Sequence, residues 1–224
     1  MTRRTQLATK DGRFYMVNFL TVDRENQIAL AENMAEGGEK AIRHRSGNLS
    51  VNVLKSTDGY RVLYLAQWGS KDDIRASMQD PEVQKYRDRA SALGKADPHA
   101  FTVFSTHYPA AAGQTITDLA ADDGRFYMVN FLTVERENQM ALAENMAEAG
   151  EKAIRHRPGC LSVNVLRSTD GYRVMYMAQW QSKDDIRASM LDPEVQKYRD
   201  RASVLGKADP HAFIVFSTHY PDVA

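Results

Sequence analysis

The chain has 224 residues, a length typical of one large domain or two small ones. Its 29 basic and 29 acidic residues give a formal net charge of zero, so the composition offers no basic surface for a nucleic acid or an anionic membrane. The single cysteine, Cys160, excludes an intramolecular disulfide and a cysteine-based metal cage. Because the sequence shows no secretory signal and no membrane-spanning apolar run, it predicts a soluble cytoplasmic protein.

The sequence contains two nearly identical copies of one segment. Residues 11–109 align without gaps with residues 123–221, at an offset of 112, and differ at 12 of 99 positions. A period of this length corresponds to a whole small domain and not to a solenoid unit. We therefore predict two domains, 1–109 and 123–224, joined by a linker over 110–122.

The first predicted element of each copy is a strand, followed by a helix. Residues 13–22 are rich in β-branched and aromatic residues, and both faces of this strand are largely apolar, so we expect it to be covered on both sides. Residues 23–45 contain good helix formers, and Ser46-Gly47 ends the pattern. The apolar and small residues at helical spacing in this segment are Ile28, Ala31, Ala35, Gly38 and Ile42.

The rest of the copy predicts a hairpin, two helices and a last strand. Strands over 49–56 and 60–68 are joined by the hairpin signal Thr57-Asp58-Gly59. Ser70 to Asp73 has the pattern of a capping box, Asp80-Pro81 begins a second helix, and residues 99–108 form the final strand.

The resulting order β-α-β-β-α-β is that of a ferredoxin-like α+β unit. The sheet of one such unit has an apolar face that its own two helices cannot cover. We therefore expect the two repeats to pack sheet to sheet as an intramolecular dimeric α+β barrel, a pseudo-dimer within one chain.

Three residues on the predicted strands are candidate site residues. Asn18 lies among apolar residues on its strand face, where an amide needs a structural partner or a ligand. Trp68 and its equivalent Trp180 are the only tryptophans, and an indole N–H can donate to a bound phenolate or peroxide, although core packing also explains such a residue. Tyr64 shares the face of Trp68 and lines a pocket or packs in the core.

Arginine supplies the candidate positive charge, whereas the histidines predict no metal site. Arg87 and Arg89 are two positions apart on a helix, roughly 200° around it, so only one of them can face a pocket. An arginine there would favour an enolate or phenolate. His44, His99 and His107 are scattered without the spacing of metal ligands.

Three motifs in each copy resemble the antibiotic biosynthesis monooxygenase family of dimeric α+β barrels, and the resemblance covers nearly all of each copy. They are Met16-Val-Asn-Phe-Leu20, Ala66-Gln-Trp-Gly-Ser-Lys71 and Asp80-Pro-Glu-Val83. The resemblance implies an enzyme that oxidises an anthrone or naphthacenone polyketide intermediate to a quinone with O2, in many members without metal or flavin. Carried over by position, it implies the catalytic residues Asn18, Trp68, Arg87, Asn130, Trp180 and Arg199, and the substrate-binding residues Tyr64, Arg89, Tyr176 and Arg201.

The chain departs from some relatives at two positions. Ile74 stands where some members have a tyrosine proton donor, so that donor is absent. Residues 83–89 contain no histidine, whereas haem-degrading relatives bind iron through one on this helix. The resemblance therefore disfavours haem degradation.

The favoured interpretation is a monooxygenase with one pocket per repeat, which uses O2 on a small aromatic polyketide without a cofactor or metal. One alternative is an oxygenase of the same fold that depends on reduced flavin. A non-oxidative polyketide cyclase or a binding protein is the other. Association of the pseudo-dimer into a further homodimer stays open.

Overall fold

The computed structural model describes residues 4–110, 116–121 and 123–222. Residues 111–115 and 122 of the expected linker lie outside the described residues. The main elements of the first repeat are β2 (Phe14–Val22), α1 (Gln27–Lys40), β3 (Asn48–Ser56), β4 (Arg61–Trp68), α2 (Lys71–Met78), α3 (Pro81–Leu93) and β6 (Pro98–His107). Those of the second repeat are β8 (Phe126–Val134), α4 (Gln139–Lys152), β9 (Cys160–Ser168), β10 (Arg173–Trp180), α5 (Lys183–Met190), α6 (Pro193–Leu205) and β12 (Pro210–His219).

The predicted element order is confirmed in both repeats, and the long first helix is shorter than expected. The segment predicted as one helix over 23–45 divides into the 3-10 turn Arg24–Asn26, α1 and the 3-10 turn Ile42–His44. Ile28, part of the helical apolar pattern, is 45% exposed, and Leu30 is buried instead. Ala31, Gly38 and Ile42 are buried as expected and Ala35 packs against the core, so the predicted apolar face is confirmed except at Ile28.

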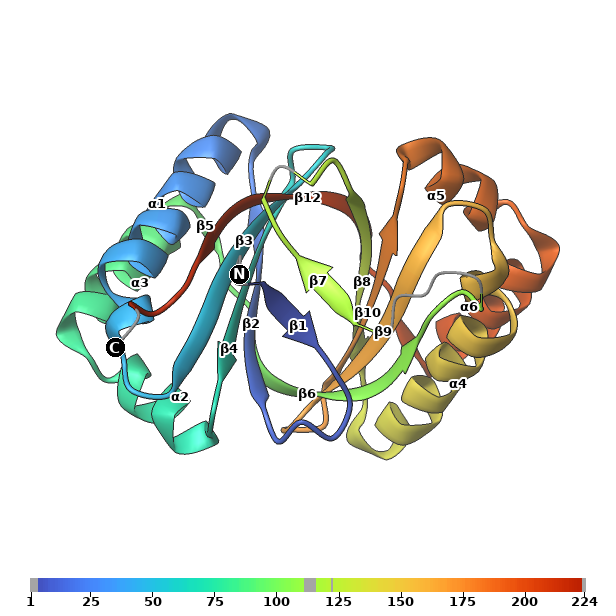
Figure 1. The fold of residues 1–224 in the computed structure, drawn as a ribbon, viewed down its shortest axis with the longest axis horizontal. Helices are drawn as coiled ribbons and strands as arrows, with labels where there is room; N and C mark the ends of the chain where they lie inside the picture. The colour runs from blue at the N-terminus through green and yellow to red at the C-terminus, as the bar shows by residue number, and fades with distance from the viewer. Residues whose placement is uncertain (1–3, 111–115, 122, 223–224) are drawn as a thin grey trace.

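The two repeats form one closed barrel with the helices outside it. The strands are hydrogen-bonded in the order β10-β9-β6-β2-β4-β3-β12-β8, and β8 pairs with β10 to complete the ring. In Figure 1, α1, α2 and α3 cover one outer side and α4, α5 and α6 cover the other. The expected intramolecular dimeric α+β barrel is confirmed.

The last strand of each repeat pairs with both repeats. The start of β6 pairs with β2 of its own repeat, from Asn18↔Pro98 to Tyr15↔Phe101. The rest of β6 pairs with β9 of the second repeat, from Phe101 to His107. β12 pairs in the same way with β8 and with β3. The sheets are therefore joined by backbone hydrogen bonds as well as by side-chain packing.

The chain also forms short strands that were not predicted from the sequence. β1 (Thr5–Leu7) pairs with β7 (Thr117–Leu119), which lies inside the segment expected as the linker. Leu7 and Leu119 are fully buried in the barrel core, and Figure 1 shows β1 and β7 near the centre of the view, between the two groups of helices. Two further short strands, β5 (Gly94–Lys95) and β11 (Gly206–Lys207), pair with β2 and β8.

Alternation along each strand divides the apolar side chains between the barrel interior and the helix-covered face. Tyr15, Val17 and Phe19 lie in the barrel core, together with their equivalents from the second repeat. Tyr64 and Trp68 belong instead to the cluster between the sheet and α1, α2 and α3. This division, predicted from the two apolar faces of β2, places the candidate residues under the helices.

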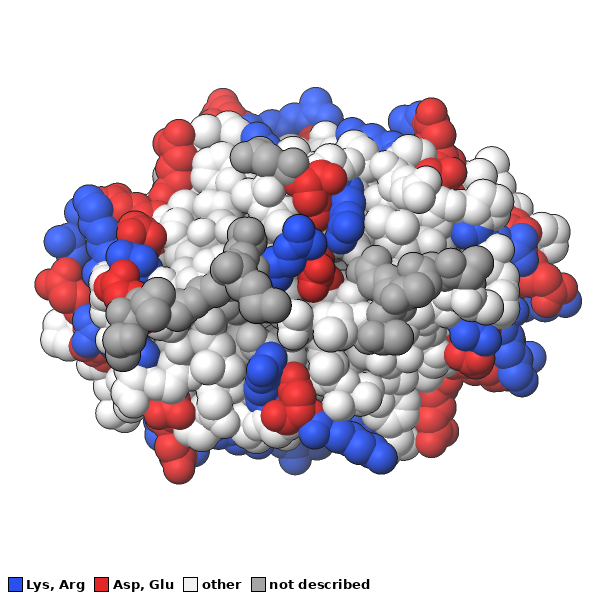
Figure 2. Space-filling model, in the orientation of Figure 1, with Lys and Arg blue, Asp and Glu red and all other residues white. Residues whose placement is uncertain are grey.

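In the described part of the chain, no helix is long and apolar enough to cross a membrane. Over the face drawn in Figure 2, basic and acidic side chains are interspersed, and neither sign gathers into one large patch.

Candidate functional site

Each repeat contains a cavity between the outer face of its sheet and its helices. The cavity of the first repeat has a volume of about 220 Å³, and that of the second about 240 Å³. Met16, Met34 and Ile42 make much of the first cavity apolar. A mostly apolar cavity with a few polar groups is the usual form of a small-molecule site.

The strand register brings Asn18 and Tyr64 together at the first cavity. Asn18 on β2 is directly opposite Tyr64 on β4 and opposite Pro98 on β6, and all three line the cavity. Residues opposite one another on neighbouring strands share a face of the sheet, so the side chains of Asn18 and Tyr64 lie on the same side. Asn130, Tyr176 and Pro210 are arranged in the same way in the second repeat.

One end of the Asn18 amide is held by the backbone. The backbone N–H of Asp97 donates to Oδ1 of Asn18 at 3.0 Å, and Asp209 donates to Asn130 at 3.0 Å. Because a backbone N–H can only donate, the oxygen of the amide must face Asp97, and this fixes the amide orientation. Among the described residues Nδ2 of Asn18 has no protein hydrogen-bond partner, so this donor is free for a ligand in the cavity.

Tyr64 and Trp68 add two buried donors with no protein acceptor. Tyr64 is 6% exposed and Trp68 is 2% exposed, and neither the phenol hydroxyl nor the indole N–H has a partner among the described residues. Burial raises the pKa of Tyr64 above its usual value of 10.0, so the hydroxyl keeps its proton and remains a donor.

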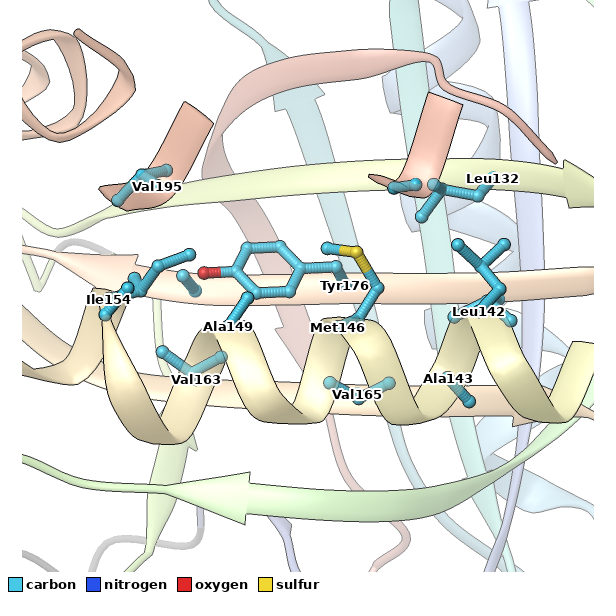
Figure 3. Close-up of a cluster of buried hydrophobic side chains, with 14 of the residues drawn as sticks. Leu132, Leu142, Ala143, Met146, Ala149, Ile154, Val163, Val165, Tyr176 and Val195 are labelled. Atoms are coloured by element: carbon cyan, nitrogen blue, oxygen red, sulfur yellow. The ribbon is translucent and has the colours of Figure 1, made fainter. Parts of the chain in front are cut away.

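In the second repeat the equivalent groups, the Tyr176 hydroxyl and the Trp180 indole N–H, also have no hydrogen-bond partner in the described part of the chain. Figure 3 shows the ring of Tyr176 lying along α4, with its hydroxyl near Ile154 and Val195. The hydroxyl therefore ends among apolar side chains.

Local sequence signals place Trp68 at the junction of sheet and helix. Trp68 is the last residue of β4, and Ser70 caps the next helix by accepting a hydrogen bond from the backbone N–H of Asp73 at 3.1 Å. Asp80 caps α3 by accepting from Glu82 N–H at 2.9 Å, with proline at the first helical position. Both predicted helix starts are confirmed, and they fix how α2 and α3 close over the cavity.

The two arginines of α3 lie on different sides of the helix. Arg87 lines the cavity at its exposed mouth, where Nη1 donates to Oε1 of Gln84 at 2.9 Å. Arg89 is not among the residues that line the cavity. Its guanidinium lies 5.4 Å from the ring centre of Tyr86 and 3.8 Å from a carboxylate oxygen of Glu36.

The same separation holds for Arg199 and Arg201. The structure thus brings Asn18, Tyr64, Trp68 and Arg87 together in one cavity and leaves Arg89 outside it. The angle of roughly 200° between positions two apart on a helix is the physical reason.

Sequence reasoning missed a polar stripe at the mouth of the cavity. Gln84, Asp88 and Ser91 line it together with Arg87, and all four are exposed residues of α3. Their spacing of i, i+3, i+4 and i+7 is one face of a helix, and this is the signal that would have found them.

The histidines of the first repeat form contacts between the repeats instead of lining the cavities. His99 and His107 lie outside the cavities and contact Asp170 and Glu151 of the second repeat. Within the described residues, no group of three or more histidine, cysteine or acidic side chains is arranged to hold a metal ion.

Several known proteins resemble this chain. Tetracenomycin-F1 monooxygenase of Streptomyces glaucescens is 35% identical over 85 residues, which are 38% of this chain and 76% of that protein. The crystal structure of an anthrone oxidase-like protein superposes with a TM-score of 0.86 at 18% identity, covering 96% of both chains. A protein from Fusobacterium nucleatum has the same fold, with a TM-score of 0.64 at 10% identity, covering 96% of this chain and 100% of that one.

A model of the family described as antibiotic biosynthesis monooxygenase matches residues 13–89 and again residues 125–201. The two matches fall on the two repeats, and each includes the asparagine, tyrosine, tryptophan and arginine of one cavity. This chain is therefore an oxygenase that belongs to the antibiotic biosynthesis monooxygenase family.

Proposed function

We propose that each repeat oxidises an electron-rich anthrone or hydroxyaromatic of the aromatic polyketide class with O2, giving a quinone without a bound cofactor. Asn18, Trp68 and Arg87 are the catalytic residues of the first cavity, and Asn130, Trp180 and Arg199 those of the second. Tyr64 and Tyr176 bind substrate. Arg89 and Arg201, which the family resemblance also suggested, have no part in this proposal because they lie outside the cavities.

The observation that carries the proposal is the set of unpartnered donors in an apolar cavity. Leaving a buried polar group without a partner costs about 1–3 kcal/mol, so such groups are kept only for a reason. The Tyr64 hydroxyl and the Trp68 indole N–H are buried donors of this kind, and neither has an acceptor among the described residues. Asn18, which is half-buried, lines the same cavity, and its Nδ2 is a third donor for which the described residues supply no acceptor. A ligand that accepts hydrogen bonds from these three donors must carry oxygen acceptors, and a negative charge on the oxygens would strengthen the bonds.

An anthrone matches this set of donors once it has lost a proton. Its methylene carbon gives a proton to water at the cavity mouth, and the negative charge spreads onto the conjugated oxygen. The donors and the positive charge of Arg87 favour this anionic form, as preorganised dipoles in an enclosed site do. The mouth, lined by exposed polar side chains of α3, leaves a route for the proton.

The oxidation then needs no reductant other than the substrate. The carbanion passes one electron to O2, and the carbon radical and superoxide combine to form a carbon–oxygen bond. Proton uptake gives a hydroperoxide, and loss of water breaks the oxygen–oxygen bond and leaves a carbonyl. In sum the methylene group and O2 become a carbonyl group and one water, so atoms and electrons balance.

The names of two relatives support this substrate class. One relative is named for the monooxygenation of tetracenomycin F1, and the structural neighbour that matches this chain over 96% of both lengths is described as anthrone oxidase-like.

The test is oxygen uptake by protein freed of metal and flavin and supplied with a model anthrone, with and without reduced flavin. We expect uptake and quinone formation in the flavin-free sample. Turnover only with reduced flavin, beyond the autoxidation of flavin itself, would replace the proposal with the flavin-dependent reaction. Conversion of substrate without oxygen uptake would favour a cyclase, and binding without conversion a binding protein.

A matched variant links the activity to the cavities. Asn18→Asp combined with Asn130→Asp keeps an oxygen that can accept from the backbone N–H but replaces the Nδ2 donor with a second acceptor. We expect this double variant to fold and to lose oxygen uptake, because a carboxylate repels the anionic substrate. Full activity in this variant would contradict the role given to the amide.

A further inference from the structure

The wall that holds Asn18 is itself held by the other repeat. Ala96 and Pro98 line the first cavity, and between them Asp97 donates its backbone N–H to Asn18. The backbone carbonyl of Asp97 accepts from Phe19 N–H at 3.3 Å, so the segment follows β2 closely. One side of this segment therefore faces the cavity and Asn18.

The opposite side of the segment contacts the β9–β10 hairpin of the second repeat. Arg173 donates to the carboxylate of Asp97 through Nε at 3.0 Å and through Nη2 at 3.2 Å. His99 bridges the two repeats, because its Nε2 is 2.8 Å from Asp97 and its Nδ1 is 2.5 Å from Asp170. The backbone N–H of Thr169 also donates to the carbonyl of Ala100 at 2.7 Å.

The same contacts occur with the repeats exchanged. Arg61 donates to Asp209 at 2.9–3.2 Å, His211 bridges Asp209 and Asp58, and Asp209 donates its backbone N–H to Asn130. Arg61 and Arg173 are each 17% exposed, so the two arginines are equivalent in burial as well as in partners.

We propose that Arg173 is a positioning residue for the cavity of the first repeat and Arg61 for the cavity of the second. Each arginine fixes the carboxylate of the residue whose backbone N–H orients the asparagine of the opposite repeat. Two parallel N–H···O contacts from a planar guanidinium define an orientation that a lysine cannot reproduce. Each cavity is lined by residues of its own repeat, but its asparagine is positioned through the hairpin of the other repeat, and this gives a physical reason for two copies to share one barrel.

This inference rests on the proposed function, and the test uses the symmetry of the two arginines. In an Asn130→Ala background, the remaining turnover comes from the first cavity. We expect Arg173→Gln to lower the kcat of that cavity by about tenfold with a smaller change in KM, since a small misplacement of a catalytic group is costly. Arg61→Gln in the same background is expected to change the kcat of the first cavity by less than about twofold, because Arg61 contacts the wall of the second cavity.

A merely structural role predicts a different result. The two substitutions remove equivalent contacts, so they should lower the thermal midpoint by similar amounts. If both also lowered the rate of the first cavity equally, the positioning role would be overturned. Arg173→Lys keeps the positive charge but not the paired hydrogen-bond geometry. Compared with Arg173→Gln, we therefore expect it to recover more of the thermal midpoint than of the turnover rate.

A readout that does not depend on turnover separates this inference from the proposed function. In ¹⁵N-labelled protein, Arg173→Gln should shift the side-chain amide signals of Asn18 and leave those of Asn130 in place, and Arg61→Gln should do the reverse. This crossed pattern in a protein without oxygenase activity would keep the positioning role and reject the proposed reaction. Unchanged Asn18 signals in Arg173→Gln would reject the positioning role itself.

Discussion

Phe19 and Phe131, which occupy equivalent positions in the two repeats, stack on each other with ring centroids 4.7 Å apart and planes 2° apart. Equivalent residues can contact each other in this way only where the pseudo-two-fold axis passes. The stack lies in the barrel core, and both rings are almost fully buried. It therefore marks the centre of the contact between the repeats.

The stack predicts a large loss of stability when one ring is removed. Phe19→Ala should lower the free energy of unfolding by about 3–5 kcal/mol, the usual cost of deleting a buried aromatic side chain. Urea unfolding followed by circular dichroism measures this loss. Ile28→Ala, at a residue that is 45% exposed, serves as the control and should change the value by less than about 1 kcal/mol. A loss as small as the control's would mean that the repeats do not depend on this contact.

Single and double tryptophan variants should show whether both cavities work. Trp68→Phe removes the indole N–H of the first cavity, so we expect about half the rate of oxygen uptake to remain from the second. Adding Trp180→Phe should lower uptake by about 100-fold in total, the size of effect seen when one donor to a developing oxyanion is removed. Circular dichroism must show both variants folded at the assay temperature. A single variant as impaired as the double one would mean that only the first cavity turns over.

Stability should depend on pH through the contacts between the repeats. Burial alone would lower the pKa of His99, but its hydrogen bonds to Asp97 and Asp170 outweigh this and raise the pKa above 6.5. A raised folded-state pKa contributes stability that is complete below pH 6.5 and is lost as the pH rises through the raised value. His211 behaves in the same way.

Asp58 and Asp170, which contact these histidines, stabilise the fold in the opposite direction of pH. Burial alone would raise the pKa of Asp170, but hydrogen bonds from Ser168, the Tyr172 backbone and His99 lower it from 3.8 to about 2. Its contribution is present above pH 3.8 and is lost as the pH falls toward 2, and Asp58 has the same shift.

Together these shifts predict the greatest stability between about pH 4 and pH 6.5. Urea titrations across pH measure the profile. His99→Asn with His211→Asn should flatten its alkaline side, and an unchanged slope would contradict the assignment.

The only cysteine should be chemically inert in the folded protein. Cys160 is 6% exposed, and burial raises the pKa of its thiol from 9.0 to about 12. Because the thiolate is the reactive form, we expect almost no reaction with a thiol reagent at about pH 8 until urea unfolds the chain. Cys160→Asn introduces the residue found at the equivalent position of the first repeat and should leave oxygen uptake unchanged. Rapid labelling of the native protein would show that the start of β9 opens.

The sequence by itself determined the parts of the protein that depend on neighbouring residues. The 112-residue offset shows the duplication, and alternation along 13–22 separates the two faces of the strand. Ser70 and Asp80 mark the helix starts because a capping side chain bonds to the backbone N–H groups two or three residues later. Asn18 was found because an amide on an apolar strand face needs a partner, whatever the rest of the fold does.

Only the tertiary structure decided what depends on residues far apart in the chain. The division of β6 between both repeats, the pairing of β1 with β7 and the contact of Arg173 with Asp97 join residues 56 or more positions apart. No local pattern encodes such pairs, since each partner alone is an ordinary strand residue or a surface charge. The choice of Arg87 over Arg89 belongs here too, because helical spacing separates the two side chains but only the packed sheet shows which one faces the cavity.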